Sequence, residues 1–383
     1  MRDLIPCFAP EWGDEERQAI IQHIIKDLYI TSGKAVERFE REFGALHGRH
    51  GVMTNSGSSA VLLATAALGL PIGAKVVTPA VTFPTTISPL LHLGLVPVFI
   101  DTEPGTYNID PEIAIQYAAD AAVIPHTLGN PVPKSLFERF DVTVEDACDA
   151  LDSTIGGRKC GTFGTVSTFS FFGAHHLCTG EGGMVLTKNR VLYDKMRSMC
   201  NWGKACVCRP GENDKCGNSL DYKLPGGEMY CHKYSFEHAG FNLKPLELQG
   251  VLGRIQLSKQ DRMKKIRKRN FDIIGAYLQS IQDRVILPRS LPDAVPNWFG
   301  YPITLKKGDR NAILRGLKRK GIQVRMVFAG NITRHKMMEG RKYEIPYPLV
   351  QSDIVMNQSF VVGIGPTVSE PEAHKIGRCL YEE

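Results

Sequence analysis

Residues 167–187 read STFSFFGAHHLCTGEGGMVLT, two strand-like runs that enclose a pair of adjacent histidines and a glycine-rich turn. Because His175 and His176 are neighbours, their side chains point in different directions, and only one of them can occupy a given place in a site. An imidazole, with an ordinary pKa of about 6.5, can accept and return a proton near neutral pH, but it cannot form an imine as a lysine amine does.

Strand-like runs of this kind alternate with helical patterns through the first two thirds of the chain. The runs are HGVMTNSG, KVVTPAVTF, LVPVFID, AAVIPHT, DVTVEDA, VSTFSFF and GGMVLT. Such alternation predicts an α/β fold with a mostly parallel sheet between two layers of helices, a three-layer αβα arrangement. From about residue 285 the pattern changes to strand, helix and strand, which predicts a smaller C-terminal α+β domain.

The composition is ordinary for a globular enzyme, since 383 residues with 43% hydrophobic and 22% charged side chains can bury a sizeable core. No apolar stretch is long enough to span a bilayer, and the first residues lack the apolar core of a secretory signal. We therefore expect a soluble, cytoplasmic protein with no membrane partner. The net charge of +6 is modest, and the basic run at 259–270 is typical of a solvated helix face, so we expect no nucleic-acid binding.

Ten cysteines without an export signal favour free thiols or metal ligation over disulfides. Four of them follow the spacing C-x57-C-x-C-x7-C, namely Cys148, Cys206, Cys208 and Cys216. The last three lie in a stretch with little apolar periodicity, which is either a flexible loop or is held by something such as a metal centre. Four thiolates suit tetrahedral zinc, although zinc sites usually use C-x2-C pairs.

Residues 55–59, NSGSS, lie between a predicted strand and a predicted helix. Free backbone N–H groups and the helix dipole make such a position an anion site, and small residues allow close approach. Ser56, Gly57 and Ser58 are therefore candidates for binding a phosphate. The alternative is an ordinary serine or asparagine helix cap.

The segment 167–187 resembles the cofactor-lysine loop of the DegT-type sugar aminotransferase-like family, with His175 in place of the lysine. The resemblance continues in TSGKAVERFEREFG (31–44), GFNLKPLELQ (240–249), RMVFAGNITR (325–334) and MNQSFVVGIG (356–365). The cysteine spacing is similar to that of one branch of this family, the CDP-4-keto-6-deoxyglucose 3-dehydrases. These enzymes depend on pyridoxamine 5′-phosphate (PMP), the amine form of pyridoxal phosphate (PLP), and on a [2Fe–2S] cluster.

The resemblance implies a fold-type-I PLP-dependent transferase whose active site forms at a homodimer interface. It also implies three parts of the chain. Residues 1–30 would pack with the small domain, residues 31–260 would form a large cofactor-binding domain with a cysteine-rich insertion at 200–233, and residues 261–383 would form the small C-terminal domain.

His175 would be the catalytic base, because counting back from GEGG (180–183) puts it, and not His176, in the place of the lysine. With no lysine at this place, the resemblance implies that the cofactor is held noncovalently as PMP.

Further cofactor contacts follow from the resemblance. Asp146, at the end of an apolar strand, would pair with the pyridine nitrogen, and Phe83 would stack on the ring. Ser170 and Asn242 would bind the phosphate, Asn242 from the other subunit. Without the resemblance, Asp146 and Asn242 could be ordinary turn or helix-cap residues. Phe83 could be an ordinary core residue.

For the four spaced cysteines, the resemblance favours a [2Fe–2S] cluster over zinc. Because Cys148 is two residues past Asp146, the cluster would lie on the order of 10 Å from the cofactor, within range for electron transfer. The remaining cysteines are expected to be small core residues: Cys7, Cys160, Cys178, Cys200, Cys231 and Cys379.

Arg325 and Arg334 match the small-domain segment that relatives use around the sugar nucleotide. A guanidinium group suits a diphosphate because it can donate two parallel hydrogen bonds. Each arginine could also be an ordinary surface residue.

The expected activity is therefore a lyase- and oxidoreductase-type deoxygenation. It would remove the 3-hydroxyl of a nucleotide-linked 4-keto-6-deoxyhexose in the biosynthesis of 3,6-dideoxyhexoses for lipopolysaccharide, with electrons from a flavin and iron–sulfur, NADH-dependent reductase. Phe172 lacks the phenol found there in the close relative, which suggests a different sugar or nucleotide. The alternatives are a redox-independent PMP 3-dehydratase of the colitose type and a noncatalytic binding protein on the same fold.

Overall fold

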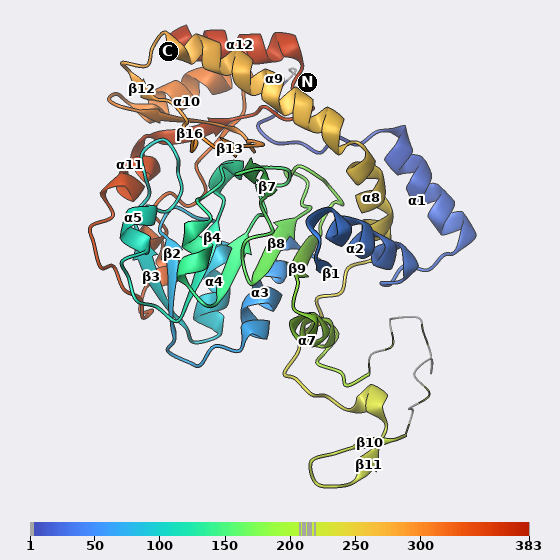
Figure 1. Ribbon diagram of the computed structural model, residues 1–383. Helices are drawn as coiled ribbons and strands as arrows, with labels where there is room; N and C mark the ends of the chain where they lie inside the picture. Colours follow the sequence, from blue (N-terminus) through green and yellow to red (C-terminus); the bar gives the residue numbers. More distant parts are fainter. Residues whose placement is uncertain (1–3, 207, 209–211, 213–216, 218–219, 383) are drawn as a thin grey trace.

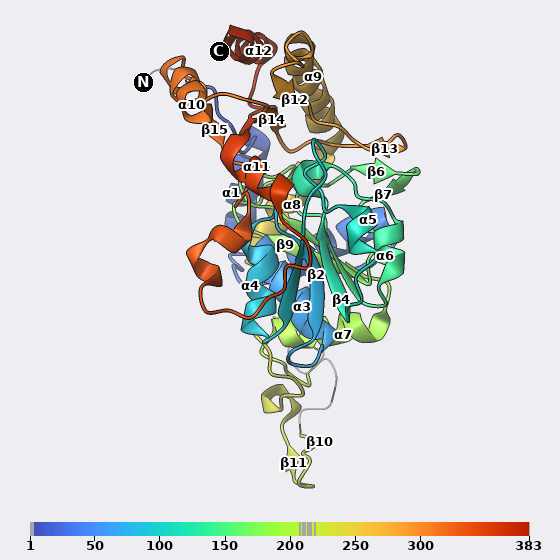
Figure 2. The same ribbon diagram turned by 90° about the vertical axis from the view of Figure 1, so that its left-hand side faces the viewer.

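The computed structural model describes residues 4–206, 208, 212, 217 and 220–382. A large domain carries a smaller domain on one side, and a cysteine-rich insertion leaves the large domain on the opposite side (Figures 1 and 2). Within these described ranges, no helix is long and apolar enough to cross a membrane.

The large domain is built on a seven-stranded sheet with the order β1-β9-β8-β5-β4-β2-β3. In that order, the strands are His50–Thr54, Gly183–Thr187, Val166–Ser170, Thr143–Asp146, Ala121–Pro125, Lys75–Pro79 and Val96–Ile100. Strand β9 is antiparallel to both of its neighbours, and the other pairs are parallel. The prediction of a mostly parallel sheet is confirmed.

Helices cover both faces of this sheet. The apolar side chains of α3 (Gly57–Leu68), α4 (Pro84–His92) and α7 (Arg190–Cys200) pack on one face. Those of α2 (Lys34–His47), α5 (Pro111–Ala114) and α6 (Ser135–Arg139) pack on the other. Strands β3 and β4 are buried along their whole length, as expected for continuous apolar runs between two helical layers. The three-layer αβα arrangement is therefore confirmed.

Two consecutive helices, α8 (Glu247–Ser258) and α9 (Gln260–Gln279), lead from the large domain to the small one (Figure 1). The basic run predicted to be a solvated helix face lies on α9, but Arg267 and Asn270 in it are buried. Asn270 donates hydrogen bonds to the carbonyl groups of Ile364 and Val368, so this part of the helix anchors the small domain.

The small domain contains a four-stranded antiparallel sheet with the order β12-β14-β16-β15. These strands are Val285–Ile286, Tyr301–Leu305, Ser359–Val362 and Val324–Arg325. Its helices are α10 (Arg310–Arg319), α11 (Val350–Gln358) and α12 (Glu370–Glu382), and the turns Ile332–Arg334 and Lys336–Met338 are 3₁₀ helices. A separate apolar core joins the sheet to α9 and α12. This is the predicted α+β pattern.

The N-terminal segment contacts both domains. Ile5 forms a parallel bridge with Ile322 of the small domain, whereas α1 (Asp14–Lys26) packs on α8. The division of the chain at residues 30 and 260 into folding units remains a prediction.

Short strands complete the large domain. Strands β6 (Thr154–Ile155), β7 (Arg158–Lys159) and β13 (Ala294–Val295) form a small sheet, and Thr127–Gly129 is a 3₁₀ turn. The insertion contains a hairpin of β10 (Tyr222–Lys223) and β11 (Met229–Tyr230) and the 3₁₀ turn His232–Tyr234. The hairpin projects from the large domain (Figures 1 and 2).

Candidate active site

A cavity of about 600 Å³ lies where the carboxyl ends of the parallel strands face the small domain. Asp146 at the end of β5 and Ser170 at the end of β8 come from the large domain, and Phe299 and Arg325 come from the small domain. Open α/β sheets bind their ligands at this edge, and a cavity with a few converging polar groups is the usual form of a ligand site.

The N-terminus of α3 forms one wall of the cavity. Ser56 caps the helix, because its Oγ accepts a hydrogen bond from the backbone N–H of Ser59 at 3.1 Å. A Cβ on Gly57 would lie 2.5 Å from Cβ of Ser170, so only glycine allows the helix to approach β8 this closely. Ser58 donates a hydrogen bond to Oγ1 of Thr85 at 3.1 Å. Free N–H groups and hydroxyls therefore converge where a phosphate could bind.

Asp146 is buried and held by hydrogen bonds to both of its carboxylate oxygens. Oδ2 accepts from the hydroxyl of Thr86 at 3.1 Å, and Oδ1 accepts from the hydroxyl of Thr168 and the N–H of Cys148, both at 3.2 Å. These bonds fix the carboxylate in the cavity wall, where it could bind a protonated ring nitrogen. The two threonines were not found from the sequence, since neither lies in a motif that predicts this role.

His175 lies in the cavity wall with 15% of its side chain exposed. Its ring stacks on that of Phe299, with centroids 5.1 Å apart and planes at 26°. Burial lowers the pKa of His175 to about 4, with a smaller contribution from the charge of Arg267. The imidazole is therefore neutral near neutral pH, as a base must be. His176 does not line the cavity, and its Nε2 lies 2.8 Å from the carbonyl oxygen of Asn297.

Asp149 is a further candidate that the sequence did not single out. Its Oδ1 lies 3.3 Å from Nδ1 of His175, although without the angle of a hydrogen bond. Burial, and then the charge of Asp146, raise the pKa of Asp149 to about 8, so this carboxyl group is mainly protonated at neutral pH. It is the third residue after Asp146, a spacing that brings both side chains to the same strand end.

Aromatic side chains close two further sides of the cavity. Phe83, half exposed, meets Phe328 edge to face with centroids 6.1 Å apart. Phe328 has φ of 46°, an unusual backbone conformation for a bulky residue that is found preferentially at ligand sites. Phe172 also lines the cavity, so flat apolar surfaces are available for an aromatic ring.

The structure brings together nine of the predicted site residues around this cavity: Ser56, Gly57, Ser58, Phe83, Asp146, Cys148, Ser170, His175 and Arg325. Arg334 does not line it and instead pairs with Asp353, with 2.6 Å between Nη2 and Oδ2. Asn242 is exposed, accepts a hydrogen bond from Lys244, and also lies outside the cavity.

The predicted metal ligands that the structure describes do not form a metal-binding group. Cys148 lines the cavity, and Cys206 and Cys208 lie in the insertion, whereas Cys216 lies outside the described residues. Among the residues that are described, no group of three or more histidine, cysteine or acidic side chains is arranged to hold a metal. The described part of one chain therefore does not form the predicted cluster site.

Most of the other cysteines occupy the places that the sequence predicts. Five are buried in the two domains: Cys7, Cys160, Cys178, Cys200 and Cys379. Cys231 is only partly buried and lies in the insertion, so it is not a core residue.

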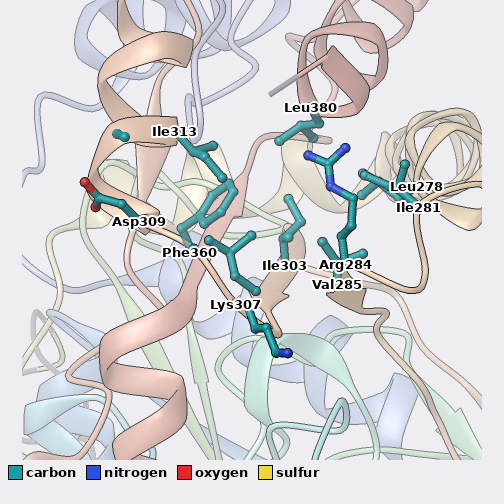
Figure 3. A pocket seen from close by; sticks show the side chains of 13 residues that line it. Leu278, Ile281, Arg284, Val285, Ile303, Lys307, Asp309, Ile313, Phe360 and Leu380 are labelled. Carbon is teal, nitrogen blue, oxygen red and sulfur yellow. The ribbon is translucent and has the colours of Figure 1, made fainter.

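A second cavity, of about 310 Å³, lies within the small domain. Figure 3 shows the apolar side chains of Ile303, Ile313 and Phe360 around its interior, with Arg284 and Lys307 among the residues that line it. It contains no histidine or cysteine, so its lining offers neither a neutral base nor a thiolate.

Comparison with known proteins agrees with this arrangement. The chain is 40% identical over 380 residues to the dTDP-4-dehydro-2,6-dideoxy-D-glucose 3-dehydratase of Saccharopolyspora spinosa, covering 93% of this chain and 81% of that one. It is 38% identical to the lipopolysaccharide biosynthesis protein RfbH of Salmonella typhimurium, over 95% and 88% of the two chains. Both proteins are therefore similar to this chain over most of their length.

A solved structure is similar over the whole fold. The Escherichia coli GDP-4-keto-6-deoxy-D-mannose-3-dehydratase with bound hydrated PLP superposes with a TM-score of 0.87 at 26% identity, covering 98% of this chain and 99% of that chain. The profile of the DegT/DnrJ/EryC1/StrS aminotransferase family matches residues 11–381. This protein has the fold-type-I architecture of PLP-dependent enzymes and belongs to the DegT/DnrJ/EryC1/StrS aminotransferase family.

Proposed function

We propose that this chain is a PMP-dependent 3-dehydrase that removes the 3-hydroxyl group of a nucleotide-linked 4-keto-6-deoxyhexose, for 3,6-dideoxyhexose and lipopolysaccharide biosynthesis. The observation that carries the proposal is His175, a neutral imidazole in a cavity whose described lining contains no lysine. Without a lysine amine, the cavity lacks the group that holds PLP covalently. The relatives named as sugar 3-dehydratases support the reaction class.

The cofactor would be held noncovalently by the groups already described. Ser56, Gly57, Ser58 and Ser170 would bind its phosphate, and Asp146 would bind the ring nitrogen. Phe83 would lie against the ring. Bound PMP would supply an amine that condenses with the 4-keto group and a ring that accepts electrons.

His175 would accept a proton from the carbon next to the amine and return it to the departing hydroxyl group, which leaves as water. Three features support this role. The imidazole is neutral, the ring of Phe299 holds it from one side, and Asp149 lies beside its other edge. Phe172 and Phe328 would keep bulk water away from the reacting atoms.

Arg325 is the better candidate for the diphosphate of the substrate, because it lines the cavity and carries a guanidinium group. To bind the substrate, Arg334 would first have to break its ion pair with Asp353. Asn242 is exposed, so a phosphate contact from it would have to be made in a second subunit of a homodimer.

Reduction after loss of water needs two electrons. A [2Fe–2S] cluster that includes Cys148 would supply them singly beside the cavity, with a flavin and iron–sulfur reductase providing electrons from NADH. Support comes from the cysteine spacing and from the position of Cys148 in the cavity wall, and the cytoplasm is the expected location. Because the described cysteines of one chain do not converge, we derive no step through this cluster.

The second candidate is a 3-dehydratase that needs no external electron donor. It is favoured by the absence of a metal-binding group among the described residues and by the similarity to the E. coli GDP-4-keto-6-deoxy-D-mannose-3-dehydratase. In that case the two electrons for deoxygenation would come from PMP, which would become PLP with release of ammonia, and an amino donor would be needed to restore PMP after each turnover. The four cysteines would then have another purpose.

One experiment separates these functions. Anaerobically purified protein is incubated with PMP and with CDP-, dTDP- and GDP-linked 4-keto-6-deoxyhexoses, with and without a reductase and NADH, and products are followed by mass spectrometry. Deoxygenated product that requires NADH supports the redox enzyme, and product formed without NADH, with PLP and ammonia released in equal amounts, supports the second candidate. Matched variants test the base: His175→Asn should bind PMP but lose about 100-fold or more of the turnover, whereas full turnover would refute the assignment.

A further inference from the structure

The N-terminal segment, residues 4–13, runs from the small domain to the start of α1, which packs on α8 (Figure 1). At its beginning, the backbone N–H of Ile5 donates a hydrogen bond to the carbonyl group of Gly321 at 2.9 Å. The buried thiol of Cys7 donates one to the carbonyl group of Val361 at 3.4 Å. The first half of the segment is therefore fixed on the small domain.

The second half of the segment is tied to the loop between β8 and β9, which carries His175. The indole N–H of Trp12 donates a hydrogen bond to the carbonyl group of Cys178 at 3.3 Å. The side chain of Gln256 joins the same two stretches. Its Nε2 donates to the carbonyl group of Glu11 at 2.9 Å, and its Oε1 accepts from the backbone N–H of Cys178 at 3.1 Å. The histidine loop and the N-terminal segment are therefore held together.

Phe8 stands between these two attachments along the chain, and its side chain lines the cavity. Its ring stacks on that of Phe299, with centroids 4.3 Å apart and planes at 18°. The same ring of Phe299 also stacks with the imidazole of His175. The backbone of Phe299 is fixed, because its N–H donates to the carbonyl group of Leu128 at 2.8 Å and its carbonyl group accepts from Arg267 at 3.1 Å. Its side chain keeps only rotation about its own bonds, which stacking on flat neighbours restricts.

We infer that Phe8 is a positioning residue for the proposed base, and that it holds His175 in place through the ring of Phe299. The inference rests on the proposed function, in which His175 accepts and returns the proton. Stacked rings keep a preferred distance and angle, so a change at Phe8 reaches the imidazole through one intermediate ring. Such a change matters for the rate, because a displacement of about 1 Å can cost on the order of 100-fold.

Phe8 also shields His175 from water, since it packs with Phe299 on the apolar core of the small domain. Burial, and then the charge of Arg267 on α9, lower the pKa of His175 to about 4. Other titratable neighbours of the imidazole include the adjacent His176 and Asp149 after β5, and burial raises the pKa of Asp149 to about 8. If water replaced the ring of Phe8, the pKa of His175 should rise toward its ordinary value of about 6.5.

Three substitutions separate the flat ring of Phe8 from its volume. Phe8→Leu keeps apolar volume without a flat ring, Phe8→Ala removes both, and Phe8→Tyr keeps the ring. With PMP-loaded enzyme, we expect kcat to fall roughly 10- to 100-fold in Phe8→Leu and Phe8→Ala, because a misplaced base loses rate. KM and the affinity for PMP should stay within about twofold of wild type, and Phe8→Tyr should recover most of the rate.

The protonation of His175 gives a second measurement, which needs neither cofactor nor turnover. Protein with isotope-labelled histidine is titrated by NMR, and the signal of His175 is assigned from its loss in His175→Asn. In wild type and Phe8→Tyr the imidazole should stay neutral down to acidic pH. In Phe8→Ala it should become protonated at clearly higher pH, since burial no longer opposes the charged form.

Leu4→Ala is the matched control for these variants. Leu4 lies in the same segment, is exposed, and does not line the cavity. Its replacement also removes an apolar side chain, but it should leave the rate and the titration of His175 as in wild type. Denaturant unfolding checks that every variant is folded.

The outcomes separate the positioning role from the proposed function. Wild-type rates in Phe8→Leu and Phe8→Ala, an equal loss in Phe8→Tyr, or a loss that is matched by weaker PMP binding would each overturn the inference. If wild type turns over none of the nucleotide sugars but the titration of His175 still moves in Phe8→Ala, the proposed function fails and the hold of Phe8 on His175 is supported. If wild type is active and neither rate nor titration changes in Phe8→Ala, only the positioning role fails.

Discussion

Nδ1 of His175 lies 3.3 Å from Oδ1 of Asp149 in the wall of the cavity, close enough for a polar contact but without the angle of a hydrogen bond. Phe299 stacks on the other side of the imidazole ring. The imidazole ring is therefore held between a flat neighbour and a polar neighbour in the cavity wall. We expect Asp149 to act as a positioning residue.

Replacing Asp149 tests this positioning. Asp149→Ala removes the polar neighbour and lets the ring turn, so we expect kcat to fall roughly 10- to 100-fold with KM nearly unchanged, because a misplaced base loses rate and not binding. Asp149→Asn keeps a polar atom of the same shape beside Nδ1 and should recover most of the rate. Steady-state kinetics with PMP-loaded enzyme measure both, and equal losses in the two variants would contradict the positioning role.

Replacing Gly57 tests whether the cofactor phosphate binds at the start of α3. A Cβ at this position would lie 2.5 Å from Cβ of Ser170, so Gly57→Ala must push α3 away from β8. We expect a loss of about 1–3 kcal/mol in the free energy of unfolding and clearly weaker PMP binding. Denaturant unfolding and fluorescence titration with PMP check these effects.

The matched control for Gly57 is Gly173→Ala. A Cβ on Gly173 would meet its nearest neighbour, Cδ of Pro10, at 4.0 Å, an ordinary contact, so this variant should be near wild type in both measurements. If Gly57→Ala also binds PMP normally, the phosphate does not lie at the start of α3.

Much of the site could be predicted from the sequence because its residues stand in short motifs at strand ends. Asp146, Ser170 and His175 follow this rule, and the structure places all three around one cavity. Asp149, Thr86 and Phe299 could not be assigned in this way, since their roles come from contacts between distant segments and not from a pattern.

The parallel sheet and the α+β domain could be predicted from the alternation of apolar runs, because such runs mark the segments that become buried. The burial of Arg267 was not predicted, because a basic run gives no sign of which of its members turns inward. Arg267 donates a hydrogen bond to the carbonyl group of Phe299 at 3.1 Å, a contact made only when α9 meets the small domain. The cluster assignment for Cys148, Cys206, Cys208 and Cys216 stays a prediction, since spacing along the chain does not fix distance in space.

Glu145 should control stability. It is fully buried, and its carboxylate lies 2.9 Å from Nε2 of His126. It also accepts backbone hydrogen bonds from Gly161, Phe163 and Gly164. Burial alone would raise the pKa of Glu145, but the hydrogen bond to His126 and the backbone N–H groups outweigh it and lower the pKa. A lowered pKa contributes stability above the ordinary value for glutamate, and this contribution is lost as the pH falls through the folded-state pKa.

We therefore expect Glu145→Gln to lower the free energy of unfolding by about 1.5–3 kcal/mol at neutral pH, since it weakens the hydrogen bonds that a buried carboxylate accepts. The difference from wild type should shrink toward acidic pH, where the wild-type carboxylate is itself protonated. Urea unfolding at several pH values measures this, and a constant difference across the range would contradict the assignment.

Arg325 and Arg334 make a matched pair for the substrate. Arg325 lines the cavity, whereas Arg334 is already paired with Asp353 outside it. Loss of a hydrogen bond to a charged group costs about 1.5–3 kcal/mol, so Arg325→Ala should raise KM for the nucleotide sugar roughly 10- to 100-fold with a smaller effect on kcat. Arg334→Ala breaks a surface ion pair that is worth little and should leave KM within about twofold. Because the two substitutions remove the same charge from the same domain, a rise in KM that is equal in both would point to long-range attraction and not to a contact of Arg325 with the diphosphate.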